Sequence, residues 1–258
     1  MADPIQIVRS RQSLRRVRGG RDGLYPILEN NTWDVVSWFD DFLGDEMRGS
    51  DAADGGYEVT TGVDGTFTML ADQPNGVARI IAGAATPAND EYCGVSLPEL
   101  SFTGDRNAVM AVRVKLNVVT DVKMEIGFTD VTTDAGAALV LATPTVTASN
   151  CALWVMDTDD TANWQTLGAI ADTVSAKNEP GTPPVAATYE TMIVALRDTN
   201  AKYLRLNTAG ELVYESSWIA SSITAATALV PWIFLQARTG ANYLMDIDFI
   251  DVRARRTT

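Results

Sequence analysis

The sequence contains no histidine. Without an imidazole side chain, the chain cannot build a Ser-His-Asp or Cys-His catalytic site, a histidine-ligated zinc centre or a histidine-based pH switch. Hydrolytic chemistry would have to rely on Asp and Glu alone, as it does in many glycosidases.

Cysteine is also scarce, because Cys93 and Cys151 are the only two. They lie far apart in the sequence and form no Cys-x-x-Cys pair, so we do not expect a metal site built on them. Two buried thiols are the favoured interpretation, and a single disulfide is the alternative. The cysteine count does not show whether the protein resides in an oxidising or a reducing compartment.

Long apolar runs and nucleotide-binding motifs are missing as well. No segment approaches the roughly 18 apolar residues of a membrane-spanning helix, and no apolar stretch follows the N-terminal arginines. We therefore expect neither a membrane helix nor a secretory signal. An organelle transit peptide is an alternative for the acid-poor start, although residues 5–18 show no clear amphipathic helical period. No P-loop or dinucleotide-binding glycine pattern occurs.

What the sequence does have is a strong segregation of charge. Residues 1–21 contain one acid, Asp3, and six arginines: Arg9, Arg11, Arg15, Arg16, Arg18 and Arg21. Arg253, Arg255 and Arg256 lie near the C-terminus, so 11 of the 20 Lys and Arg and 32 of the 33 Asp and Glu lie in between. The middle of the chain therefore carries a net charge of about −21, against +5 for the arm and +3 for the tail.

Such complementary charges favour docking of the arm on an acidic protein surface, including that of another copy. We expect a homo-oligomer in which residues 1–31 form an arm that anchors the assembly and residues 32–258 form the folded body. Broad nucleic-acid binding needs a basic face, so the acidic body argues against it. Contact of the arm alone with nucleic acid is the alternative.

The body consists of short strand-like runs bounded by Gly, Asp, Asn and Pro. After an aromatic and acidic stretch at residues 33–45, the predicted strands are residues 66–70, 77–82, 92–97, 100–102, 108–116, 123–128, 152–156, 164–170, 189–196, 203–207, 212–214, 232–238 and 243–253. Residues 217–228 are only weakly helix-like, and residues 177–187 are expected to be an exposed connection. This pattern predicts an all-β fold of two packed antiparallel sheets.

The last predicted strand alternates apolar and acidic residues. Met245, Ile247 and Phe249 share one parity and are predicted to face the core, whereas Asp246 and Asp248 are predicted to face solvent.

Two stretches of this body resemble a known fold. The Phe-Asp-Asp-Phe-Leu-Gly of residues 39–44, the long alternating strands and the closing Met-Asp-Ile-Asp-Phe-Ile-Asp-Val-Arg of residues 245–253 resemble the concanavalin A-like lectin and glucanase jelly roll. The resemblance covers about residues 33–255 and implies a two-sheet jelly-roll sandwich whose first and last strands lie side by side.

A jelly roll preceded by a basic arm is also similar to virion proteins of tailed bacteriophages, such as capsid decoration proteins and head or tail fibres. This resemblance implies a non-enzymatic structural protein of the virion, whose arm contacts capsid or tail proteins. The alternative is a lectin-like carbohydrate-binding module that recognises a surface glycan during host attachment, and a glycan hydrolase is a further one.

Catalysis by a glycan hydrolase needs two carboxylates across a sugar. Retaining glucanases of this fold carry a strand of the type Glu-x-Asp-x-x-Glu. Glu125 lacks such acidic neighbours, and Asp246 and Asp248 lie on the closing strand, so we expect no catalytic residues.

Two further patterns are candidates for binding. Asp157, Asp159 and Asp160 are the best candidates for a structural Ca²⁺, although their spacing fits no helix–loop–helix calcium loop; no other cofactor is expected. Trp164, beside Asn163 and close to Asp160, is the candidate exposed platform for a glycan. In contrast, Trp154 and Trp232 lie within apolar runs and are expected in the core.

Overall fold

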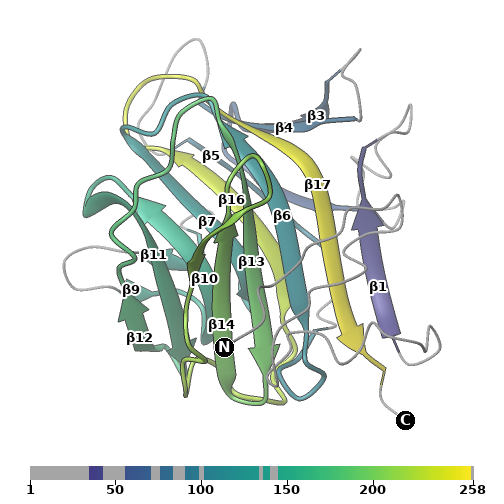
Figure 1. Cartoon of the computed structure of the whole chain (residues 1–258). Coiled ribbons are helices and arrows are strands. Elements are labelled where there is room, and N and C mark those ends of the chain that lie inside the picture. The colour runs from purple at the N-terminus through teal and green to yellow at the C-terminus, as the bar shows by residue number, and fades with distance from the viewer. Residues whose placement is uncertain are drawn as a thin grey trace.

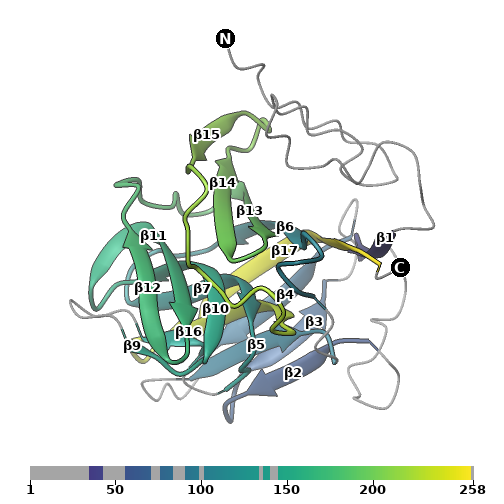
Figure 2. The same cartoon turned by 90° about the horizontal axis from the view of Figure 1, so that it is seen from below.

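Two antiparallel β-sheets pack face to face in the protein, whose structure is a computed structural model (Figures 1 and 2). The structure describes residues 35–42, 56–70, 76–83, 91–98, 102–133, 136–139 and 145–256. The predicted arm with its six arginines lies outside the described residues. Within the described ranges there is no helix, and hence none long and apolar enough to cross a membrane. The all-β prediction is confirmed.

The first sheet has eight strands, and its neighbouring strands are hydrogen-bonded in a non-sequential order. Along the sheet these are β15 (Leu212–Glu215), β14 (Asn200–Leu206), β13 (Tyr189–Arg197), β6 (Val109–Leu116), β17 (Tyr243–Arg255), β4 (Ala78–Ala82) and β3 (Thr66–Met69), with β1 (Val35–Asp40) also paired with β17.

The second sheet has seven strands and lies against the first. Its order is β12 (Thr173–Asn178), β11 (Thr161–Ile170), β10 (Asn150–Asp157), β7 (Val122–Thr129), β16 (Val230–Ala237), β5 (Tyr92–Ser96) and β2 (Glu58–Thr61). A two-stranded hairpin, β8 (Ala138–Leu139) and β9 (Thr145–Val146), lies in the connection between β7 and β10.

The period-2 alternation of the central strands builds the core between the sheets. On β6, Val112 and Val114 point into the sandwich, and on β7, Met124, Ile126 and Phe128 do the same from the other sheet. All five side chains are buried. Because each apolar side chain removed from water contributes about 1.5–3 kcal/mol, these two facing rows are a main source of the stability of the sandwich.

The first and last described strands lie side by side, as the resemblance implied (Figure 1). β1 runs antiparallel to β17, with Val35 opposite Arg255 and Asp40 opposite Ile250. On β1, Trp38 packs edge-on against Tyr57, at 5.8 Å between ring centroids. The two strands, which are more than 200 residues apart in the sequence, are thus joined by a complete ladder.

The predicted facing of Phe249 is wrong. Ile247 lies opposite Val114 and Phe249 lies opposite Arg113, so two residues of β17 match one step on β6 and Asp248 is the extra residue of a β-bulge. The bulge reverses the parity of the strand. Met245 and Ile247 face the core as predicted, but Phe249 points to the outer face of the sheet and packs there.

Two other predictions need correction. Residues 173–178 form strand β12, which the sequence did not predict, and the last two of these residues belong to the predicted connection at residues 177–187. Residues 217–228 contain turns and one isolated bridge, between Ile219 and Ala201, and no helix. Arg253 belongs to the closing strand β17, as predicted, and its Nε donates to Asp251 Oδ1 at 2.8 Å.

Candidate functional site

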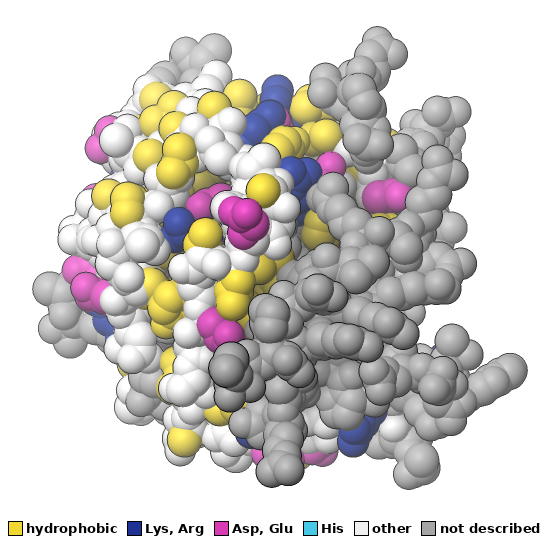
Figure 3. Space-filling model, in the orientation of Figure 1, with side chains coloured by type: hydrophobic (Ala, Val, Ile, Leu, Met, Phe, Trp, Pro, Cys, Tyr) yellow, Lys and Arg dark blue, Asp and Glu magenta, His cyan; other side chains and the backbone are white. Residues whose placement is uncertain are grey.

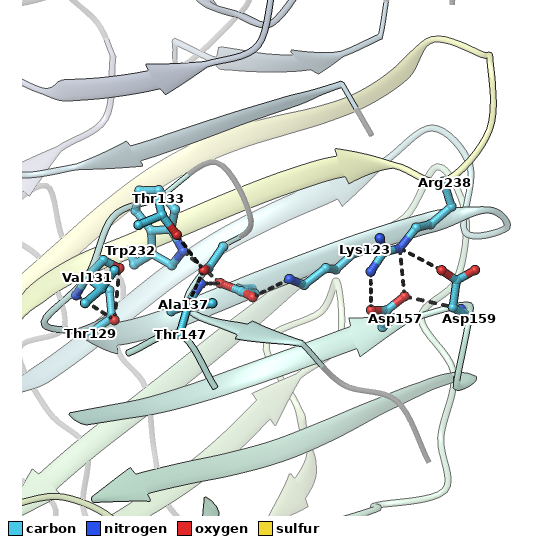
Figure 4. A network of polar contacts seen from close by, with 12 residues as sticks. Lys123, Thr129, Val131, Thr133, Ala137, Thr147, Asp157, Asp159, Trp232 and Arg238 are labelled. Atoms are coloured by element: carbon cyan, nitrogen blue, oxygen red, sulfur yellow. Dashed lines mark hydrogen bonds and ion pairs between the residues drawn. The ribbon is translucent and has the colours of Figure 1, made fainter. Parts of the chain in front are cut away.

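A row of buried polar side chains lies on the outer face of the seven-stranded sheet, the face turned away from the other sheet (Figure 4). Lys123 and Glu125 flank Met124 on β7. Because Met124 points into the core, the two charged side chains point outwards. Asp157 on β10 lies directly opposite Lys123. The alternation around Met124 was visible in the sequence, but the burial of its charged neighbours was not.

Lys123 and Glu125 form a fully buried ion pair. Lys123 Nζ lies 2.9 Å from Glu125 Oε1, and both side chains are 0% exposed. The second carboxylate oxygen, Glu125 Oε2, accepts hydrogen bonds from the backbone N–H of Ala137 at 2.7 Å and from Trp232 Nε1 at 2.9 Å. The carboxylate is therefore neutralised and hydrogen-bonded, which is the arrangement that a charge needs inside a protein.

The connection between β7 and β10 seals this ion pair from outside. Gly136 has a φ of +74°, and a Cβ at this position would lie 2.6 Å from Glu125 Oε1 and 2.9 Å from Lys123 Nζ. The carbonyl oxygen of Gly136 accepts hydrogen bonds from the hydroxyls of Thr133 at 3.0 Å and Thr147 at 2.5 Å. Glycine is required here by both the backbone conformation and the lack of space.

Apolar side chains surround the pair on the sheet. Trp232 and Phe234 stack on one another at 5.5 Å between centroids, and Lys123 Nζ lies 5.3 Å from the Phe234 ring. Cys151 on β10 belongs to the same cluster, and burial, with the charges of Glu125 and Asp130, raises the pKa of its thiol well above the usual range. An unreactive, apolar environment of this kind keeps the carboxylate of Glu125 away from solvent.

A second ion pair lies at the end of the same row. Arg238 Nε donates to Asp157 Oδ1 at 3.0 Å, and its Nη2 donates to Asp157 Oδ2 at 2.5 Å. Asp157 is fully buried, while Asp159, whose Oδ2 lies 3.3 Å from Arg238 Nε, is half exposed. The buried carboxylates of Glu125 and Asp157 on this face are thus each paired with a cation. Glycoside hydrolysis would instead need a pair of carboxyl groups that a sugar can reach.

Trp164 does not lie where the sequence predicted. Its side chain is 0% exposed and packs edge-on against Trp154 inside the sandwich, with its Nε1 donating to Glu190 Oε2 at 3.2 Å. Asn163 has the opposite parity on β11. The structure therefore separates the two residues across the sheet, and Trp164 cannot serve as an exposed platform. The expectation that Trp154 and Trp232 are buried is confirmed.

The predicted calcium ligands do not converge either. Asp157 binds Arg238, whereas Asp160 Oδ2 accepts from Gln165 Nε2 at 2.7 Å and from Lys177 Nζ at 2.9 Å. Burial raises the pKa of Asp160, but the hydrogen bonds from Gln165 and Lys177 outweigh it and lower the pKa. Among the described residues, no group of three acidic or cysteine side chains could hold a metal ion.

Asp246 and Asp248 both lie on the outer side of the eight-stranded sheet, each with its own cation. Asp246 bonds Arg79 Nε at 2.6 Å and Lys115 Nζ at 2.9 Å, and Asp248 Oδ2 accepts from Arg113 Nη1 at 2.7 Å. Asp246 is nearly buried rather than solvent-exposed. Asp246 precedes the bulge and Asp248 is its extra residue, and because each is bound to its own cations the two acids do not form a catalytic pair of the glucanase type.

The two cysteines are free and buried, which confirms the favoured interpretation and rules out the disulfide. Cys93 belongs to the cluster between the sheets and Cys151 to the cluster on the outer face, so the sheet itself separates them. Burial raises the pKa of the Cys93 thiol to about 12. Neither thiol is a nucleophile at neutral pH.

Comparison with known proteins identifies the fold as a concanavalin A-like jelly-roll sandwich. The structure is similar to a protein of unknown function from Shewanella oneidensis, with a TM-score of 0.61, 15% identity, and coverage of 87% of this chain and 90% of that one. It is also similar to arcelin-5, a lectin-like defense protein from Phaseolus vulgaris, with a TM-score of 0.57, 7% identity, and coverage of 87% and 100%.

Enzymes share the same architecture. A putative beta-glucanase from Mycobacterium abscessus matches with a TM-score of 0.51, 11% identity, and coverage of 83% of this chain and 98% of that one. At these identities the likeness establishes the fold and not the activity. The sequence matches no protein-family model and no curated protein sequence.

Proposed function

We propose that this chain is a non-enzymatic structural protein of a virion, a capsid decoration or a head or tail fibre component, attached through its arginine-rich arm. The observation that carries the proposal is that basic side chains of the body form ion pairs with acidic side chains of the same body. The basic side chains of the body that form ion pairs with acids of the body are Arg79, Arg113, Lys115, Lys123, Lys177, Lys202, Arg205, Arg238 and Arg253.

This pairing leaves an acidic surplus on the body, while the first 21 residues hold six arginines and only one acid. On the face drawn in Figure 3, acidic and basic side chains of the described residues are scattered among uncharged ones and form no basic patch. The arm is therefore the part of the chain suited to an acidic partner surface, whether a capsid or tail protein or another copy of the chain.

The outer face of the seven-stranded sheet supports the non-enzymatic part of the proposal. Glu125 and Asp157 are the fully buried carboxylates there, and each is paired with a cation and closed off from solvent. A general acid or nucleophile for glycan hydrolysis must instead reach the sugar. The virion assignment itself rests on the resemblance of a jelly roll with a basic arm to tailed-phage structural proteins.

Charge reversal in the arm tests the attachment. Replacing Arg15, Arg16 and Arg18 together by Glu should abolish incorporation into the particle with which the native chain co-sediments. The matched triple replacement by Lys keeps the charge and should retain incorporation, with a stronger loss at high salt. Equal incorporation of the two variants, or a native chain that sediments free of any particle, would contradict the proposal.

A carbohydrate-binding role in host attachment is the second candidate, and the fold shared with arcelin-5 favours it. A glycan array with the intact chain separates the two. Specific glycan binding without particle association would support the lectin-like role. Release of reducing sugar by the purified intact chain would support an enzyme instead.

A further inference from the structure

The connection between β12 and β13, residues 179–188, crosses from the seven-stranded sheet to the eight-stranded sheet. Within it, residues 181–187, Gly-Thr-Pro-Pro-Val-Ala-Ala, are exposed except for Pro184, which is buried. Both ends of this segment have a left-handed backbone, with a φ of +72° at Gly181 and +55° at Ala187. A Cβ at Gly181 would meet no atom within 4 Å, so the glycine serves the turn of the backbone and not close packing.

Arg205 of β14 binds the middle of this segment. Its Nη1 donates to the carbonyl oxygen of Thr182 at 3.1 Å and to the Thr182 hydroxyl oxygen at 2.8 Å. Its Nη2 donates to the carbonyl oxygen of Pro183 at 3.4 Å. The Thr182 carbonyl also accepts from the backbone N–H of Trp164, on the other sheet, at 3.3 Å. Thr182 is therefore the point at which the segment is tied to both sheets.

The Arg205 side chain reaches the segment from between the two sheets. Arg205 lies opposite Met192 and Glu190 lies opposite Val114, and because Met192 and Val114 are core residues, both charged side chains also point inwards. Glu190 Oε1 lies 3.1 Å from Arg205 Nη2, and each of the two side chains is 8% exposed. A buried guanidinium needs acceptors for its N–H groups, and here the connection supplies three of them beside the carboxylate.

We propose that residues 181–187 form a strap that opens and closes as a unit over this end of the sandwich, and that Arg205 is its latch. Among the described residues the strap belongs to no β-ladder, so it can leave without breaking either sheet. Gly181 and Ala187 are its hinges, because residues at the ends of a loop absorb the backbone change when the loop moves. The N–H of Ala187 donates to the carbonyl oxygen of Leu116 at 2.6 Å, which anchors the second hinge on β6.

Two features oppose closure of the strap. Ala187 has a Cβ, so its left-handed backbone is unfavourable. Burial raises the pKa of the Glu190 carboxyl, although Arg205 and Trp164 act in the opposite direction, so the carboxylate is held between the sheets at a desolvation cost. The hydrogen bonds of Arg205 offset both costs in the closed state. A strap balanced in this way opens without unfolding of the sheets, and its opening lets solvent reach Arg205 and Glu190.

This inference does not depend on what the N-terminal arm binds, and hydrogen exchange of the full-length chain tests it. Arg205→Met with Glu190→Gln removes the latch without leaving a buried charge unpaired. The Trp164 amide, which donates to the strap, should then exchange about tenfold faster or more, since a hydrogen bond to a charged group contributes roughly this factor. Lys202→Met with Glu215→Gln is the matched control, because it removes an ion pair between β14 and β15. Equal exchange of the Trp164 amide in the two double variants would overturn the proposal.

A change on the strap itself provides a second readout that leaves the buried pair intact. Thr182→Val removes the hydroxyl that Arg205 binds, at an exposed position, so the body should fold as in the wild type. Elastase cuts after small apolar residues, and it should cleave this variant after residues 185–187 several-fold faster than the wild-type chain. Thr173→Val makes the same chemical change at an exposed position of β12 and should leave cleavage at the wild-type rate. Equal cleavage of the two variants, or cleavage confined to other segments, would contradict the proposal.

Discussion

Ile247 and Phe249, two residues apart on β17, point to opposite faces of the eight-stranded sheet. Ile247 packs in the core, and Phe249 packs on the outer face against Phe39 and a cluster of apolar side chains on β6, β13 and β14. The bulge at Asp248 causes the difference, and Arg113 holds the Asp248 side chain at 2.7 Å. The bulge therefore divides β17 into two halves, which pair on one edge with β4 and with β1, respectively.

The two residues should differ in their contribution to stability. Ile247→Ala should lower the free energy of unfolding by about 2–5 kcal/mol, because it leaves a cavity in a closed core. Phe249→Ala should cost less, since its ring is only half buried and lies on the outer face of the sheet. Urea denaturation of the two variants measures both values, and a larger loss for Phe249→Ala would refute the assigned facing.

The buried ion pair of Lys123 and Glu125 should be costly to break on one side only. Glu125→Gln keeps the shape of the side chain but leaves the Lys123 ammonium without its counter-charge, so we expect a loss of about 3–5 kcal/mol. Adding Lys123→Met should recover much of that loss. A double-mutant cycle by chemical denaturation checks this, and strictly additive effects would argue against coupling.

Asp246 should make stability depend on pH. Burial raises the pKa of this carboxyl, but the hydrogen bonds from Arg79 and Lys115 outweigh it and lower the pKa. A carboxyl with a depressed folded-state pKa stabilises the protein above its unfolded pKa of about 3.9, and this contribution disappears as the pH falls through the folded-state value.

At pH 7 Asp246→Asn should therefore lower the free energy of unfolding by about 1–3 kcal/mol, with a gap to wild type that narrows below about pH 4. Glu58→Gln, on an exposed position of β2, is the matched control and should have little effect. Denaturation curves between pH 3 and pH 7, in the range of the unfolded carboxyl pKa of about 4, measure both gaps. A pH-independent gap for Asp246→Asn would show that the carboxylate charge is not responsible.

Trp164 should act as a core residue. Trp164→Ala should cost about 3–5 kcal/mol, because it removes a large buried ring that contacts Trp154. Asn163→Ala, next to it on the opposite face of β11, should cost less than about 1 kcal/mol. Thermal denaturation distinguishes them. A stable Trp164→Ala protein that has lost binding to a glycan would restore the platform hypothesis.

Most of the strands could be predicted from the sequence because their side chains alternate between two different environments. In β6 and β7, apolar residues at every second position are required wherever one face of a strand is buried against another sheet. Strands β12 and β2 were missed because they are short edge strands with polar composition, where packing contributes little to the choice of residues. The same holds for the hairpin of β8 and β9.

The errors at the candidate site have a common cause. A polar neighbourhood around Trp164 suggested exposure, but alternation on β11 places Trp164 inside and Asn163 outside. The three acidic residues at 157–160 suggested a calcium site, but Arg238, which follows β16, binds Asp157, and Lys177 of β12 binds Asp160. Local sequence contains no information about which cation the fold brings to each carboxylate.

The sequence by itself determined the all-β class, the absence of imidazole chemistry and the separation of a basic arm from an acidic body. These follow from composition and from a period of two, which are properties of neighbouring residues. The bulge at Asp248, the sealed Lys123–Glu125 pair and the apolar patch over β6, β13 and β14 were decided only by the tertiary structure. Each depends on strand register and on residues from remote segments, because burial and pairing of a side chain are set by what the whole fold places against it.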